Sequence, residues 1–109
     1  MLNAFQRIIE TQLEGLQREM ARAADELRVM EIVGSAGGGA VKVTVTGLGD
    51  VLDITIDPAV LVEADCGLVQ DLVCAGVREA LRKANEVRRA RLSEALPLAG
   101  LGMELPDIF

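Results

Sequence analysis

The sequence predicts an α+β fold in which a long helix, a three-stranded antiparallel sheet and a second long helix follow one another (α-β-β-β-α). Apolar residues recur at alternating spacings of four and three near the N-terminus, valines alternate with polar residues in the middle, and a second helical pattern follows. The 109 residues suit one domain, which we place at residues 1–96, with an apolar tail containing Pro and Gly at 97–109.

Residues 2–30 are predicted to form one helix with an apolar seam. At 1.5 Å per residue this helix is about 42 Å long, whereas a compact chain of this size has a radius of gyration of about 13 Å. We therefore expect it to extend beyond its own domain, with the seam covered by the second helix, by a partner chain or by both. The seam has heptad spacing and consists of Ile9, Leu13, Leu16, Met20, Ala23, Leu27 and Met30.

The segment 30–57 changes to a period of two, which is typical of strands with one buried face. AVKVTVT and VLDITI are two predicted strands, and EIVG is a weaker first strand. Short glycine-rich connections between them predict an antiparallel meander. The residues predicted to face inward are Val41, Val43, Val45, Leu52, Ile54 and Ile56, and those predicted to face solvent are Lys42, Thr44, Thr46, Asp53 and Thr55.

The glycine triplet 37–39 raises the question of a phosphate-binding loop. Such a loop needs a lysine and a hydroxyl residue directly after its last glycine, but here Ala40 and Val41 follow and a strand begins. A dinucleotide-binding loop would open a helix instead. We interpret the triplet as a corner, because glycine adopts the positive φ angles that tight connections need. Contact of this exposed loop with a ligand is the less favoured alternative.

The second helix is predicted over residues 66–95. We expect a turn or a helix start at Asp57-Pro58 and then an irregular link, with Asp65 as the N-cap of the second helix and Pro97 ending it. The residues predicted to lie on its apolar side are Val73, Val77, Ala80, Leu81 and Ala84.

The composition argues against several classes of function. The chain has no His, Trp or Tyr, so neither cysteine has a histidine to activate it, and no metal-ligand spacing is present. We expect no catalysis, no cofactor, no metal and no small-molecule substrate. Cys66 and Cys74 would lie about 12 Å apart on one helix, too far for a disulfide, and we interpret both as buried apolar groups.

The location is predicted from two absences. No run approaches the roughly 18 apolar residues of a membrane span, and no basic segment followed by an apolar stretch marks a secretory signal. Together with the unpaired cysteines, these features predict a cytoplasmic protein that does not contact a membrane.

The charges are unevenly placed. The net charge is −6, yet segment 78–91 carries six cations and two anions, while the remainder carries five and fifteen. On a helix Arg78, Arg82 and Arg89 fall within about 40° of one another, and such a row can neutralise phosphates along a duplex. The alternative is a solvated face with Glu79–Lys83 and Arg82–Glu86 pairs. The candidate DNA-binding residues are Arg78, Arg82, Asn85, Arg88 and Arg89, together with Arg18 and Arg22 on the first helix.

The order of these features resembles the YbaB/EbfC family of nucleoid-associated proteins. The resemblance covers residues 27–86 and rests on a G-x-A-G-G-G loop, a V-x-V-T-V-x-G strand, an I-x-I-D-P turn and the segment DLVCAGVREALRKA. It implies small cytoplasmic homodimers, associated with the nucleoid, whose helical arms grip double-stranded DNA and alter its conformation, with a possible role in gene regulation. The site residues above rest on the charge argument, because we carry over no DNA-contacting motif from the family.

Two other functions stay open at this stage. The seam and the C-terminal tail could dock a protein partner in an interaction module without a DNA role. The other is an enzyme or a binder of phosphate ligands that uses the glycine loop.

Overall fold

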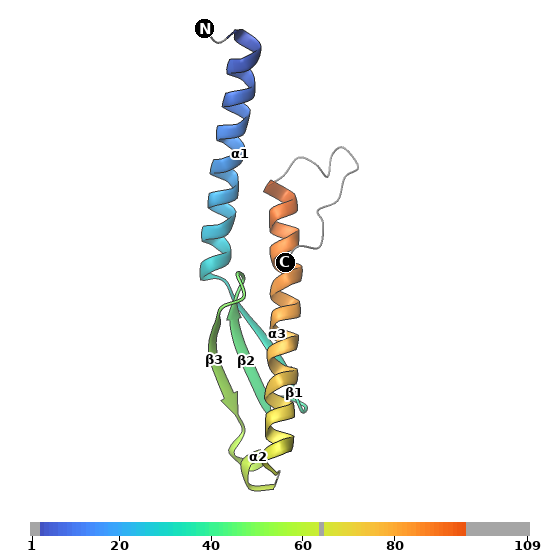
Figure 1. Cartoon of the computed structure of the whole chain (residues 1–109). Coiled ribbons are helices and arrows are strands. Elements are labelled where there is room, and N and C mark those ends of the chain that lie inside the picture. The colour runs from blue at the N-terminus through green and yellow to red at the C-terminus, as the bar shows by residue number, and fades with distance from the viewer. Residues whose placement is uncertain (1–2, 64, 96–109) are drawn as a thin grey trace.

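The computed structural model describes residues 3–63 and 65–95 and confirms the α-β-β-β-α fold (Figure 1). The predicted tail and the end of the second helix at Pro97 lie outside these residues, so the division into domain and tail stays a prediction. The elements are α1 (Ala4–Val29), β1 (Glu31–Ala36), β2 (Val41–Thr46), β3 (Val51–Ile56), α2 (Pro58–Glu63) and α3 (Cys66–Ala95).

Helix α1 begins at a capping box and projects past the sheet (Figure 1). The Asn3 side chain accepts a hydrogen bond from the Gln6 backbone at 2.8 Å, and the Gln6 side chain accepts one from the Asn3 backbone at 3.1 Å. Within the seam Ala23 and Leu27 are fully buried, whereas Leu13 is 54% exposed. The radius of gyration of 19.9 Å and the 72 Å length confirm that the helix extends beyond its domain.

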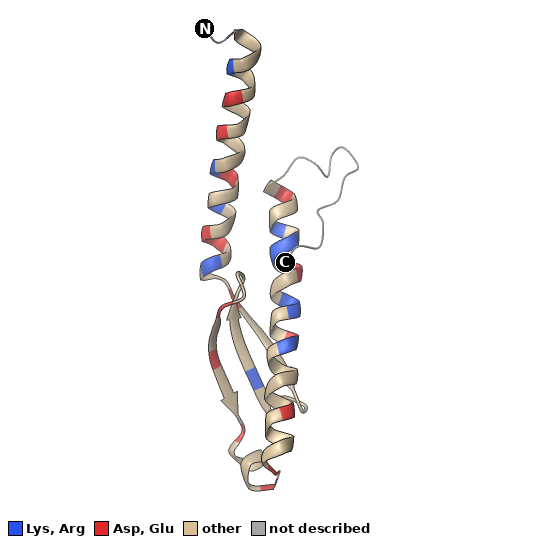
Figure 2. Cartoon of the chain, viewed as in Figure 1, with Lys and Arg blue, Asp and Glu red and all other residues tan. Residues whose placement is uncertain are grey.

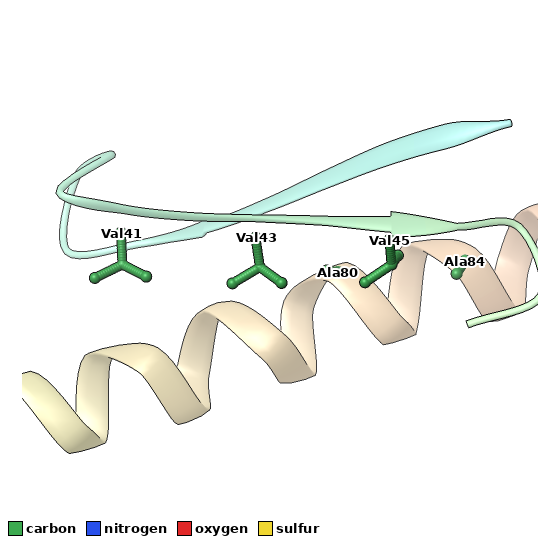
Figure 3. Packing of buried hydrophobic residues seen from close by; sticks show 5 residues of the cluster. All are labelled: Val41, Val43, Val45, Ala80 and Ala84. Atoms are coloured by element: carbon green, nitrogen blue, oxygen red, sulfur yellow. The ribbon is translucent and has the colours of Figure 1, made fainter. Parts of the chain in front are cut away.

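The core lies between β2 and α3. The side chains of Val41, Val43 and Val45 point from β2 toward α3, where they meet Ala80 and Ala84 (Figure 3). The strands are ordered β1-β2-β3, and both pairs are antiparallel, as predicted.

Small residues allow α3 to approach this sheet closely. A Cβ atom at Gly34 would lie 2.2 Å from the backbone nitrogen of Ala80, and one at Gly76 would lie 3.1 Å from a Val43 methyl group. The helix therefore contacts strand backbone where a larger residue would hold the two apart.

Strand β3 departs from its predicted burial. Ile54 and Ile56 pair with the core valines of β2, but Val51 rather than Leu52 pairs with Val45 because of an irregularity in register. Helix α3 packs over β1 and β2, so Leu52 is 53% and Ile54 41% exposed. The prediction that these two residues are buried is wrong for the single chain.

Thr46 is a second correction, because it was predicted to face solvent and is instead buried. Its hydroxyl oxygen accepts hydrogen bonds from the backbones of Leu48 and Asp50 in the β2–β3 loop, at 3.2 and 3.1 Å. A polar group with these partners is readily buried.

Of the two alternatives for Asp57-Pro58, the helix start is confirmed, because Pro58–Glu63 forms the short helix α2 where an irregular link was expected. Asp65 caps α3 as predicted and accepts a hydrogen bond from the Leu68 backbone at 2.7 Å. Cys66 and Cys74 carry free thiols, but both are exposed, so the prediction that they are buried is wrong. Leu81, expected on the apolar side, is also 38% exposed. Ala80 and Ala84 are buried as predicted, and Gly76 and Leu92 are buried as well.

Gly34→Ala is expected to lower the free energy of unfolding by about 1–3 kcal/mol, because the added methyl group would overlap the backbone of α3. Gly15→Ala is the matched control. Its Cβ would meet nothing closer than 4.0 Å, and alanine should stabilise the helix by up to about 1 kcal/mol. Urea denaturation of the full chain measures both. A Gly34→Ala variant as stable as the wild type would contradict the close approach.

Candidate nucleic-acid interface

Four of the seven predicted site residues meet at one groove on α3. Arg78, Arg82, Asn85 and Arg88 line an open groove of about 500 Å³. Their spacing of three and four residues places them along one side of the helix, away from the alanines that face the sheet. Lys and Arg are concentrated along the middle and C-terminal part of this helix (Figure 2). The groove is completed by Leu81 of α3 and by Leu48 and Gly49 of the β2–β3 loop.

The β2–β3 loop is a wall of the groove that the charge argument did not identify. Gly49 has a φ of 93°, a conformation that favours glycine. Gly47 donates a backbone hydrogen bond to the Leu27 carbonyl at 2.9 Å, and its own carbonyl accepts one from Arg88 Nη1 at 3.2 Å. The loop is thus joined to both long helices. The glycines of GLGD, between two predicted strands, were the signal for a tight turn, but not for its contact with α3.

Arg78 and Arg82 have different surroundings. Arg78 is exposed, and within residues 3–63 and 65–95 it has no ion pair or hydrogen bond. Arg82 donates to Glu79 at 2.8 and 3.1 Å and to Glu86 at 2.6 Å. The hydrogen bonds from Arg82 hold the pKa of Glu79 below its ordinary value, and the same contact raises the pKa of Arg82. Both ion pairs of the solvated-face alternative are therefore present, since Glu79 also lies 3.9 Å from Lys83.

Arg88 has a structural role in the groove, because it connects α3 to the β2–β3 loop. It is half-buried and donates to the Asn85 side chain at 3.3 Å as well as to the loop carbonyl. It therefore fixes the Asn85 amide and the loop relative to α3. Arg89 is also half-buried, and it does not line the groove.

The two predicted residues of α1 lie elsewhere. Arg18 lines a separate groove with Leu13, Leu16 and Ala95, at the end of α3. Arg22 is paired with Glu19 at 2.6 Å. The structure does not bring these arginines to the groove of α3. A different arginine joins the helices, because Arg91 binds Glu26 at 2.6 Å.

The glycine triplet forms the corner between β1 and β2. Its φ angles are 63°, 68° and 95°, which confirms the expected conformation. In a meander this corner and the β2–β3 loop lie at opposite ends of the sheet, so the triplet is remote from the arginines. Among the described residues no group of His, Cys, Asp or Glu could hold a metal ion. None of the described helices has an apolar stretch long enough to cross a membrane.

Comparison with known proteins finds similar proteins over most of the chain. A nucleoid-associated protein of Acetivibrio thermocellus is 44% identical over 98 residues, which cover 90% of this chain and 84% of the relative. One of Rhodococcus erythropolis is 41% identical, with 89% and 85% covered. A crystal structure of an uncharacterized Helicobacter pylori protein has the same fold, with a TM-score of 0.72 at 21% identity, over 86% of this chain and 97% of that one.

The family model gives the most direct assignment. It matches residues 3–99, and so spans α1, the sheet and α3 together. The motifs between residues 27 and 86 had indicated the same family. The chain therefore belongs to the YbaB/EbfC DNA-binding family.

Proposed function

We propose that this protein is a non-enzymatic, nucleoid-associated protein that binds duplex DNA through backbone phosphates and alters the conformation of the duplex. The observation that carries the proposal is the groove of α3, which gathers Arg78, Arg82 and Arg88 on the solvent side of a long helix. Membership of a family described as DNA-binding supports it, as do the names of the relatives. Gene regulation would be a consequence of altered DNA conformation.

The chemistry of the groove favours phosphate contact over base readout. Guanidinium groups bind phosphate oxygens with two parallel hydrogen bonds, and contacts of this kind position a protein on DNA without reading sequence. None of the described residues that line the groove is an aromatic on which a base could stack. Binding should therefore be largely independent of sequence and should fall steeply with salt.

A homodimer is the assembly that we propose for this function. Ile54 lies opposite the core residue Val43 in the sheet, yet it stays partly exposed next to the more exposed Val51 and Leu52. The core is thus incomplete on the β3 side, and apolar patches of this kind mark interaction surfaces. Association of two chains through β3 would cover these residues and present two copies of α3 to one duplex.

Arg78→Gln is expected to weaken binding to a random 40-base-pair duplex about fivefold and to lower the salt dependence by about one phosphate contact per α3 that binds. Fluorescence anisotropy at several salt concentrations measures both effects. Lys42→Gln is the matched control, since Lys42 is exposed on a sheet face away from the groove. Equal affinities of wild type and Arg78→Gln would show that the groove is not the site.

Arg88→Gln is expected to act mainly on stability, because Gly47 would lose a hydrogen bond from a charged donor. The free energy of unfolding should fall by about 1–2 kcal/mol, whereas Arg78→Gln should change it by less than about 0.5 kcal/mol. Urea denaturation distinguishes the two arginines. Equal effects of the two substitutions on the free energy of unfolding would contradict a structural role for Arg88.

Leu52→Asp is expected to separate the dimer, because the new carboxylate would be buried in the interface without a partner. In the single chain this residue is exposed, so each protomer should stay folded. Light scattering coupled to size-exclusion chromatography measures the mass. Val33→Asp is the control, since Val33 is 48% exposed at the other edge of the sheet, on β1. A dimer that survives Leu52→Asp would exclude β3 as the interface.

A protein-interaction role is the second candidate. The projecting end of α1 exposes Phe5, Ile8, Ile9 and Leu13, which gives a partner helix an apolar stripe to contact. No binding to the duplex even at low salt would favour this candidate over the first.

A further inference from the structure

We infer that Glu79 and Glu86 compete with DNA phosphates for Arg82 and so set the affinity of the groove, an inference that rests on the proposed DNA binding. Arg82 Nε and Nη2 donate to the two carboxylate oxygens of Glu79 at 3.1 and 2.8 Å. Nη1 donates to Glu86 at 2.6 Å. The fork with which an arginine grips a phosphate is therefore already filled by carboxylate oxygens.

The charges around Arg82 explain why its ion pairs would affect phosphate binding. Arg82 and its two glutamates together carry a net charge of −1, which Lys83 at 3.9 Å from Glu79 offsets. An approaching phosphate therefore meets a neutral cluster at this position and not an unpaired arginine. Arg78, one turn earlier, is exposed and has no ion pair among the described residues. Arg78 and Arg82 thus contribute unequally to phosphate binding, because Arg82 can bind a phosphate only when a carboxylate is displaced.

The competition is partial because the group is open to water. The side chains of Arg82 and Glu86 are 55% and 65% exposed, and exposed ion pairs of this kind favour the bound form by only about two- to fivefold. Glu79 is held more firmly. Its side chain is 34% exposed, and Lys83 Nζ, which donates to the Val33 carbonyl at 3.1 Å, lies 3.9 Å from the same Glu79 oxygen that Arg82 Nη2 contacts. Glu86 is therefore the carboxylate that a phosphate displaces first.

The test removes the two carboxylates while keeping side-chain shape. The Glu79→Gln, Glu86→Gln double variant of the full chain is titrated with a 40-base-pair duplex by fluorescence anisotropy at several salt concentrations. Affinity at low salt should rise about four- to twenty-fivefold, because each of the two exposed pairs accounts for about two- to fivefold. The slope of log affinity against log salt should steepen by about 0.9 for each α3 that contacts the duplex, because Arg82 then neutralises a phosphate.

Controls separate release of Arg82 from a general loss of negative charge. The same two substitutions in an Arg82→Gln background should give neither the gain in affinity nor the steeper slope. Asp71→Asn removes a single acid that is exposed on α3 and has no ion pair within the described part of the chain. Glu86→Gln, the matched single variant, should exceed its effect and replaces the double variant if that one fails to fold.

Each pattern of results decides the inference. A gain of equal size in the Arg82→Gln background, or an unchanged slope, would overturn it while leaving DNA binding intact. Wild-type binding with no gain in either carboxylate variant would do the same. Absence of duplex binding by the wild type and by every variant would overturn the inference together with the proposed function.

Discussion

The close approach of α3 to the sheet is the contact on which the rest of the structure depends. Glycine at 34 and 76 and alanine at 80 and 84 let the helix lie directly against β1 and β2. Because small and aliphatic residues fill the buried side, the charged residues of α3 are left for its other sides. The arginine groove is thus a consequence of how the core is packed. Larger residues between α3 and the sheet would move the helix away from the β2–β3 loop that completes the groove.

Net charge is a poor guide to this surface. The chain is acidic overall, but its acids and bases are sorted by position, with segment 78–91 strongly basic. Electrostatic attraction to a polyanion depends on the local potential at the contact. The acidic remainder repels a polyanion elsewhere on the surface. This sorting gives a protein that is acidic overall a local surface that attracts a polyanion.

Local patterns predicted most of the fold, because helix seams, strand alternation, caps and glycine corners are each determined by neighbouring residues. The long helices, the meander and the N-cap at Asp65 were of this kind. The burial of β3 could not be predicted in the same way. Ile54 and Leu52 have the alternation of a buried strand, but what covers them depends on where α3 lies and on the irregular register beside Val45. The exposure of Cys74 depends on the same contact.

The candidate site was predicted in part for a similar reason. The spacing of Arg78, Arg82 and Asn85 places them on one side of a helix, and periodicity alone can show this. The contribution of Leu48 and Gly49 required the tertiary contact through Arg88. The separation of Arg18 and Arg22 from the groove likewise follows from the placement of two helices, which no local pattern encodes.

The anchoring of α1 has a mechanical consequence. Its buried seam residues, Ala23 and Leu27, lie in its last two turns, and Gly47 fastens the same end by a hydrogen bond to the Leu27 carbonyl. The helix is about 39 Å long at 1.5 Å per residue, and these contacts hold it at its C-terminal end. A tilt of about 5° at the C-terminal end would move the N-terminal tip of α1 by roughly 3 Å, which is comparable to the spacing of successive base pairs. Small adjustments in the β2–β3 loop are thereby amplified at the tip of α1 without unfolding any part of the core.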